Sequence, residues 1–127
     1  NKRFDTHFNY TNIVMTVGAA GGLNTILKTI INPGDEVLTF APFFGEYRNY
    51  VSNFGGKLVA VSPDTATFQP KFDEFEKLIN KNTKAVIVNN PNNPTGTVSS
   101  VEEMHIILQF CRRHNLHLVF LLSIIHN

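Results

Sequence analysis

The feature of this sequence that most constrains its fold is a regular alternation between short apolar runs and longer segments with helical spacing. The runs are rich in Val, Ile, Leu and Phe, as strands buried on both faces are. They lie at residues 13–17, 36–41, 57–62, 84–89 and 117–122. This alternation predicts an α/β fold in which a mainly parallel sheet is flanked by helices on both faces.

Amphipathic segments separate these runs. The longest stripe of apolar residues at three- and four-residue intervals ends at NPGDE, residues 32–36, whose proline and glycine stop a helix. The members of that stripe are Leu23, Ile26, Leu27, Ile30 and Ile31. Shorter helices are expected over residues 46–54 and 68–80, and a fourth begins at the capping box that Ser100 and Glu103 would form. We therefore expect each strand except the last to be followed by a helix.

Composition narrows the class of protein. The chain has 127 residues, of which 43% are hydrophobic and 17% charged, as expected for one globular domain. A formal net charge of +1 provides no basic surface for nucleic acid, and the longest apolar stretch, residues 118–122, is far too short to span a bilayer. The single cysteine, Cys111, excludes an internal disulfide and favours a reducing, cytoplasmic location. We therefore expect small-molecule partners, and no nucleic acid or membrane.

The first candidate binding segment is GAAGG at residues 18–22, between a predicted strand and a predicted helix. Ligands of open α/β sheets bind beyond the carboxyl ends of strands. The first N–H groups of a helix attract phosphate, and small residues let a ligand approach them closely. The segment matches neither G-x-G-x-x-G nor a Walker loop, so a tight turn that binds nothing is an equally good interpretation.

The second segment is APFFGEY at residues 41–47, in which two aromatic residues follow a proline. The ring of Phe44 could lie against a planar ligand. Both phenylalanines could instead belong to the core, which is the commoner place for aromatic side chains. Tyr47, Arg48 and Tyr50 are interpreted as helix-face residues and not as ligands of a substrate.

The third segment is NNPNNPTG at residues 89–96, directly after an apolar run. Pro91 and Pro94 fix two backbone angles and restrict the asparagine before each of them. An asparagine amide held in such a loop is a fixed donor for a ring hydroxyl or an oxyanion. The alternative is a solvated turn stabilised by its own asparagine side chains.

No metal site is expected. His114 and His117 are three residues apart, but a metal ion needs more ligands than two, and the neighbouring sequence offers none. We interpret this pair as part of a solvated loop before the last strand.

Together the three segments resemble the signature of the class I/II pyridoxal-phosphate-dependent aminotransferases of fold type I, the aspartate aminotransferase group. A small-residue turn, then NPGDEVLTFAPFFGEY, then KAVIVNNPNNPTG occur in the order found in that family. The resemblance runs from about residue 12 to about residue 122 and rests on all three segments. It implies that residues 1–127 form part of the large domain that binds pyridoxal phosphate, and both ends of the sequence look truncated.

The resemblance implies cofactor contacts for five residues. Gly18, Ala19 and Ala20 would bind the phosphate of pyridoxal 5'-phosphate, here through backbone N–H groups because family members often have a hydroxyl or amide side chain where this chain has alanine. Phe44 would stack on the pyridine ring, and the amide of Asn93 would donate to the phenolic oxygen of the ring. The Asn93–Pro94 bond, in a rigid functional turn, is a candidate for the cis form. The implied reaction is amino-group transfer between an amino acid and a 2-oxo acid, in a homodimer for full-length members.

Three further roles of the family have no matching residue here. The aspartate that pairs with the pyridinium nitrogen should follow the last strand, where this chain has Ser123, Ile124 and Ile125. The last lysine is Lys84 and the last arginine is Arg113. Both come too early for the Schiff-base lysine and for the arginine that binds the substrate carboxylate. We therefore expect no catalytic residue in this chain and no activity from the chain alone.

Other functions fit the same segments. A PLP-dependent lyase or synthase of the same fold would share all three of them. A non-catalytic regulator could use such a domain only to bind the cofactor. A degenerate remnant without function is a further interpretation, because the catalytic groups are missing.

Overall fold

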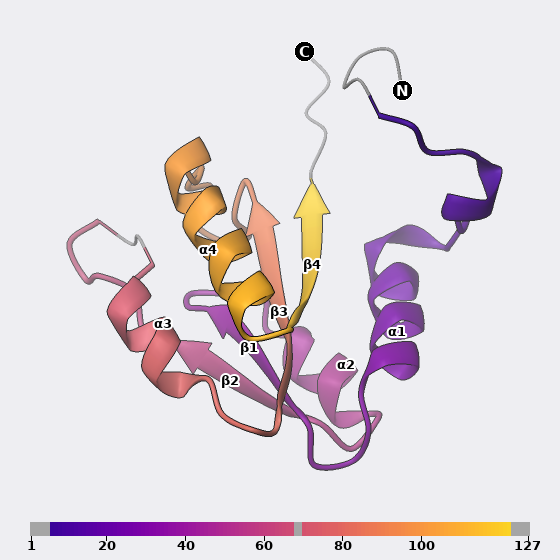
Figure 1. The fold of residues 1–127 in the computed structure, drawn as a ribbon, viewed down its shortest axis with the longest axis horizontal. Coiled ribbons are helices and arrows are strands. Elements are labelled where there is room, and N and C mark those ends of the chain that lie inside the picture. Colours follow the sequence, from indigo (N-terminus) through magenta and orange to yellow (C-terminus); the bar gives the residue numbers. More distant parts are fainter. Residues whose placement is uncertain (1–5, 68–69, 123–127) are drawn as a thin grey trace.

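The computed structural model describes residues 6–67 and 70–122 of the chain, and in them a four-stranded parallel sheet lies between two pairs of helices (Figure 1). In chain order the elements are the 3-10 helix η1 (Tyr10–Asn12), α1 (Gly18–Ile30), β1 (Glu36–Phe40), α2 (Tyr47–Ser52), β2 (Lys57–Val61), α3 (Phe72–Leu78), β3 (Thr83–Asn90), α4 (Val101–Arg113) and β4 (His117–Leu122). None of the helices within the described ranges is both long and apolar enough to cross a membrane.

Strand β3 lies inside the sheet, whose order is β2-β1-β3-β4. On one side it pairs with β1, where Val37 is opposite Ala85, and on the other with β4, where Val86 is opposite Leu118. All three pairings are parallel. The carboxyl ends of the described strands therefore meet at one edge of the sheet.

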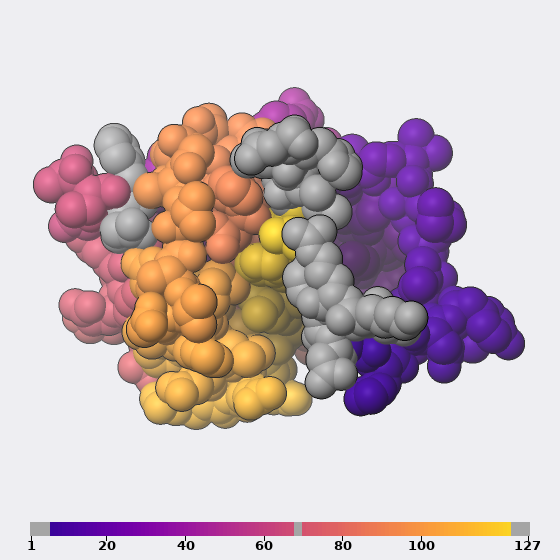
Figure 2. Space-filling view, turned by 90° about the horizontal axis from the view of Figure 1, so that it is seen from above, coloured from indigo at the N-terminus to yellow at the C-terminus, as the bar shows by residue number. Residues whose placement is uncertain are grey.

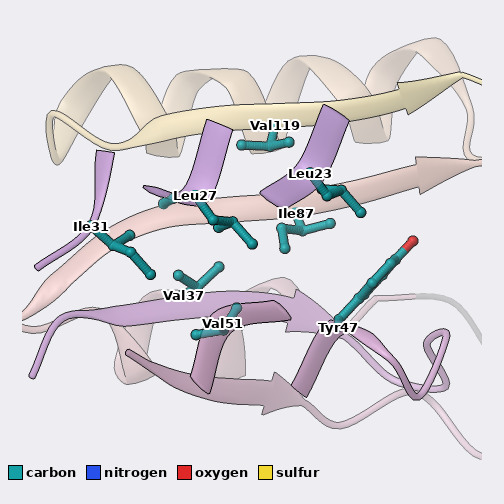
Figure 3. Close-up of a cluster of buried hydrophobic side chains, with 9 residues drawn as sticks. Leu23, Leu27, Ile31, Val37, Tyr47, Val51, Ile87 and Val119 are labelled. Atoms are coloured by element: carbon teal, nitrogen blue, oxygen red, sulfur yellow. The ribbon is translucent and has the colours of Figure 1, made fainter. Parts of the chain in front are cut away.

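Both faces of the sheet are covered, because alternate side chains of each strand point to opposite faces. One buried cluster joins the sheet to α1 and α2 (Figure 3) and comprises Leu23, Leu27, Ile31, Val37, Tyr47, Val51, Ala85, Ile87 and Val119. The other joins the sheet to α3 and α4 and comprises Leu38, Phe40, Val61, Phe75, Val86, Val88, Ile107 and Cys111. The predicted parallel α/β sheet with helices on both faces is confirmed.

The predicted strand over residues 13–17 is wrong. The segment is irregular and lies outside the sheet, with Ile13, Met15 and Val17 at 60%, 89% and 94% exposure. A strand needs a neighbour that pairs with its N–H and C=O groups. None of the described strands pairs with this segment, so an apolar run alone was not sufficient to make it a strand.

The helix predictions are confirmed, except that one residue predicted on an apolar stripe is exposed. Ser100 and Glu103 form the predicted capping box, in which the Glu103 N–H donates to Ser100 Oγ at 3.1 Å and the Ser100 N–H donates to Glu103 Oε2 at 2.7 Å. In α1, Leu23 and Leu27 are buried as expected, whereas Ile26 is 41% exposed. Ile26 lies at the margin of the apolar stripe, beyond the arc of the helix that faces the sheet.

The core packing around Phe75 generates a stability prediction. Its ring is fully buried, with its centroid 5.2 Å from that of Phe40 and 5.4 Å from that of Phe110. Phe75→Ala should lower the free energy of unfolding by about 3–5 kcal/mol, because the variant loses the free energy of burying the ring and also leaves a cavity in the core. Urea denaturation measures the change. The control Phe120→Ala, at a position 42% exposed on β4, should cost far less, and equal losses would contradict the described packing.

The buried thiol of Cys111 gives a second prediction. Burial raises the pKa of Cys111 from 9.0 to about 11. Because the thiolate is the reactive form, alkylation near pH 8 should be slowed roughly 100-fold by the pKa difference alone. The same raised pKa makes the folded state lose stability as pH rises from about 9 through 11, relative to Cys111→Ala. Labelling with N-ethylmaleimide in buffer and in urea checks the first effect, and urea midpoints across that pH range check the second.

Candidate functional site

The three candidate segments meet at the carboxyl edge of the sheet. The loop after β1 carries residues 41–46, the loop after β3 carries residues 91–100, and the N-terminus of α1 lies beside them. Between these segments is a pocket of about 320 Å³, lined among others by Ala19, Ala20, Phe44 and Asn93. Seen from above, the indigo α1 side of the molecule and the orange α4 side lie on opposite sides of the yellow strand β4 (Figure 2). Four of the five predicted cofactor residues therefore line one pocket, and Gly18 is adjacent to them in sequence.

The N-terminus of α1 offers backbone donors to this pocket. Val17 at the N-cap makes no side-chain capping bond, and no described group accepts from the N–H of Gly18, Ala19 or Ala20. Gly18 has a φ of +65°, which an L side chain rarely adopts, although a Cβ there would meet nothing within 4 Å. Helix N-termini with free N–H groups attract anions. The predicted small-residue turn is thus the first turn of the helix itself.

The structure separates the roles of the two adjacent phenylalanines. Phe43 packs against the buried cluster and stacks on Tyr47, with ring centroids 6.3 Å apart and planes at 11°. Phe44 lines the pocket, is 39% exposed and meets Tyr47 edge-on at 5.9 Å and 72°. Phe43 is therefore partly buried against the core, whereas Phe44 keeps part of its ring available to a ligand.

Hydrogen bonds fix the loop after β3. Asn90 Oδ1 accepts from the Ser99 N–H at 3.0 Å. The Asn92 N–H donates to the carbonyl of Thr97, and the Gly96 N–H donates to the carbonyl of Asn92, each at 2.8 Å. The loop is thus a turn stabilised by its own asparagine side chains and backbone, which is the second of the two interpretations given for residues 89–96.

Asn93 stands apart from this network. Its side chain is exposed at the pocket and makes no hydrogen bond within the described part of the chain. The Asn93–Pro94 bond is cis, as are the bonds before Pro42 and Pro91. The rigid loop therefore leaves one amide unused, and that amide belongs to the residue predicted to bind the cofactor.

Tyr47 and Asn89 also line the pocket, although neither was predicted as a site residue. Tyr47, interpreted as a helix-face residue, is 4% exposed and lines the pocket. Burial raises the pKa of Tyr47, while a hydrogen bond with the Asn89 side chain acts in the opposite direction and less strongly. Asn89 Oδ1 is buried and finds no hydrogen-bond partner within residues 6–67 and 70–122. The proximity of Tyr47 to Phe44 in the sequence was the available signal, but spacing could not show that Tyr47 is buried at the pocket wall.

The remaining predicted positions are placed as follows. Ser123, Ile124 and Ile125 lie outside the described residues. Among the described residues no group of three or more His, Cys, Asp or Glu side chains could hold a metal ion.

Comparison with known protein families shows which family this chain belongs to. The model of the family "Aminotransferase class I and II" matches residues 2–120. This chain belongs to the class I and II aminotransferases. The family is pyridoxal-phosphate-dependent, and the four-stranded parallel sheet described above is part of its large domain.

Individual relatives agree with this assignment. The chain is 37% identical over 123 residues to a probable kynurenine–oxoglutarate transaminase of Saccharomyces cerevisiae. This alignment covers 88% of this chain and 28% of that protein. It is 31% identical over 119 residues to an aspartate aminotransferase of Thermotoga maritima, covering 93% and 32%. The chain thus spans about 30% of the length of these curated relatives.

Solved structures show the same partial coverage. The putative kynurenine aminotransferase Bna3p of Saccharomyces cerevisiae aligns with a TM-score of 0.88 at 34% identity, over 94% of this chain and 31% of that one. An amino transferase of Eubacterium rectale aligns with a TM-score of 0.81 at 38% identity, over 92% and 31%. The aminotransferase fold of the described residues is therefore shared with experimentally determined structures.

The different surroundings of Phe43 and Phe44 generate a paired prediction. Phe44→Leu should leave the urea midpoint almost unchanged and weaken binding of pyridoxal phosphate several-fold, since an aromatic contact contributes about 0.5–1.5 kcal/mol. Phe43→Leu should do the reverse, because its ring belongs to the core. Equilibrium dialysis and urea denaturation of both variants provide the measurements. A loss of stability in Phe44→Leu equal to that in Phe43→Leu would show that Phe44 is also a core residue.

Proposed function

We propose that this chain forms the cofactor-binding part of an aminotransferase that moves an amino group between an amino acid and a 2-oxo acid, with pyridoxal 5'-phosphate as cofactor. The observation that carries the proposal is the meeting of free helix N–H groups, a half-exposed aromatic ring and an unused asparagine amide around one pocket. The two named relatives act on different amino acids according to their names. The proposal therefore extends to the substrate class and not to one amino acid.

The residues present fit this cofactor. The N–H groups of Ala19 and Ala20 are donors without described partners, which suits a phosphate. The ring of Phe44 offers an apolar surface to a planar heterocycle, and the Asn93 amide offers a donor to its phenolic oxygen. The buried Asn89 Oδ1 without a partner is further support, because such an atom is destabilising unless a ligand or water satisfies it.

When bound, pyridoxal phosphate supplies the electron sink for amino-group transfer. The chain itself supplies binding and orientation. The N-terminus of α1 would hold the phosphate, Phe44 would cover one face of the ring, and Asn93 would fix its rotation by a directional hydrogen bond. Three contacts on different sides of a planar molecule define one orientation, which is what catalysis requires of a binding site.

We infer that the chain alone transfers no amino group. The lysines on the described strands are Lys57, first in β2, and Lys84, second in β3. Both lie at the amino edge of the sheet. A strand rises about 3.3 Å per residue, so Lys84 is roughly 16–20 Å along β3 from the carboxyl edge where the pocket lies. Borohydride reduction and mass spectrometry of the chain with pyridoxal phosphate should therefore find no adduct on Lys57 or Lys84.

The remaining parts of the proposal concern the whole protein. A homodimer and a cytoplasmic location are proposed from the family resemblance and from the single, buried cysteine. Measurement of the oligomeric state of this chain fused to the rest of the large domain of a relative would test the first.

Substitution of Ala20 by aspartate tests the phosphate site in a way that separates folding from binding. A carboxylate in the first turn of α1 should stabilise the helix by about 0.3–1 kcal/mol through its dipole. The same carboxylate should weaken binding of pyridoxal phosphate at least fivefold or so, since like charges in contact cost about 1 kcal/mol even in water. Urea denaturation and equilibrium dialysis measure the two effects, which have opposite signs.

Two controls accompany this variant. Ala20→Ser adds no charge and should leave both quantities close to wild type. Pyridoxal, which lacks the phosphate, should bind Ala20→Asp as well as it binds the wild type. Equal weakening for pyridoxal and pyridoxal phosphate would place the phosphate elsewhere, and absence of binding by the wild-type chain would contradict the proposed cofactor site in this chain.

A further inference from the structure

The end of strand β4 forms one wall of the pocket. Leu121 and Leu122, the last two residues of β4, line the pocket together with Leu23 of α1. Leu121 lies opposite Asn89 in the parallel pairing of β4 with β3, and it packs against the buried cluster that contains Leu23. Figure 3 shows Leu23 as the labelled α1 side chain nearest to the arrowhead ends of the strands. This wall is therefore built of three aliphatic side chains.

No charged side chain lines the pocket within the described part of the chain. Its polar groups are the hydroxyls of two tyrosines and the amides of two asparagines, namely Tyr47, Tyr50, Asn89 and Asn93. All its other lining residues are alanine, leucine or phenylalanine. The last Asp or Glu of the 127 residues is Glu103, in the first turn of α4. A ligand in this pocket therefore meets no carboxylate from β4 or from the residues that follow it in this sequence.

The lack of a carboxylate bears on the ring nitrogen of the cofactor. A pyridinium is a cation, and sites for pyridoxal phosphate commonly pair it with an aspartate. In apolar surroundings a nitrogen base favours its uncharged form, so its pKa falls. Asn89 Oδ1 could accept from a pyridinium N–H, but an uncharged amide offsets only part of the cost of burying a cation without a counter-charge. The pocket therefore favours an unprotonated ring nitrogen.

We propose that this pocket holds pyridoxal phosphate with its ring nitrogen unprotonated, and that it recognises the phosphate, the flat ring and the phenolic oxygen without using the nitrogen. The pocket should then also accept phosphate esters of flat rings that have no basic nitrogen. The inference rests on the proposed cofactor site and adds to it the class of ligand that the site selects. It follows from the position of Leu121 and Leu122 in the wall of the pocket.

Two ligands of the same shape test the role of the nitrogen. Pyridoxal phosphate and 1-deazapyridoxal phosphate differ only in the ring nitrogen, which a C–H group replaces. Both carry the aldehyde, so reaction with surface lysines affects both alike. Equilibrium dialysis measures the affinity of the wild-type chain for each ligand. The nitrogen-15 chemical shift of bound pyridoxal phosphate, labelled at the ring nitrogen, shows directly whether that nitrogen carries a proton and requires no activity.

Two pairs of variants test the β4 wall. Leu121→Asp places a carboxylate in the wall, and Leu121→Asn is its uncharged counterpart of the same shape. Leu122→Asp and Leu122→Asn repeat the comparison at a position that is 61% exposed, in case the partly buried Leu121 tolerates neither change. Urea midpoints show which of the variants are folded.

The wild-type chain should bind the two ligands with affinities that agree within about twofold, and the bound nitrogen should be unprotonated near pH 7. At least one aspartate variant should prefer pyridoxal phosphate to its deaza analogue by about tenfold, the equivalent of about 1.4 kcal/mol. The reason is that a carboxylate can form a charge-assisted hydrogen bond with a protonated ring nitrogen. The same variant should protonate the nitrogen, whereas its asparagine counterpart should not.

Two results would overturn the inference and leave the cofactor site in place. The first is a wild-type preference of roughly tenfold or more for pyridoxal phosphate over its deaza analogue, or a protonated nitrogen in the wild-type complex. The second is an unchanged ratio of affinities in every folded aspartate variant, since the nitrogen would then not meet the β4 wall. If the wild-type chain binds neither ligand, the proposed function fails for this chain and the inference fails with it.

Discussion

The parallel pairing of β3 with β1 and β4 is the constraint on which the rest of this structure depends. Parallel strands bring their carboxyl ends to a common edge, so the loop after β1 and the loop after β3 become neighbours although some fifty residues separate them. The pairing also requires a crossover segment between consecutive strands, and α2, α3 and α4 are those segments. The position of the pocket follows from this topology before any side chain in it is considered.

Burial of both sheet faces makes that edge a rigid platform. Neighbouring residues of one strand, such as Val86 and Ile87, belong to different clusters, one packed by α3 and α4 and the other by α1 and α2. A displacement of β3 would therefore disturb packing on both sides. Loops that project from such a sheet can hold functional groups in fixed positions. The loop at residues 91–100 adds hydrogen bonds of its own to this support.

The pocket shows a division between groups that are used by the fold and groups that are left over. Asn90 and Asn92 make hydrogen bonds within the loop, whereas the side chain of Asn93 makes none with the described residues. The ring of Phe43 packs against the core, whereas part of the Phe44 ring lies exposed at the pocket. The buried Asn89 Oδ1 is likewise left without a hydrogen-bond partner among the described residues. Unused groups that meet in one place are the physical basis of the proposed cofactor site.

Local chemistry in the sequence was sufficient for much of this protein. Apolar periodicity predicted β1 to β4 and α1 to α4 near their observed bounds, and the capping box at Ser100 needed only residues three positions apart. The ordered segments also predicted the family and four residues that line the pocket. Tertiary structure alone decided that the apolar residues 13–17 are exposed and that Tyr47 is buried and lines the pocket. The physical reason is that propensity and periodicity act within a few residues, whereas burial and hydrogen-bond partnership depend on strands and helices distant in the sequence.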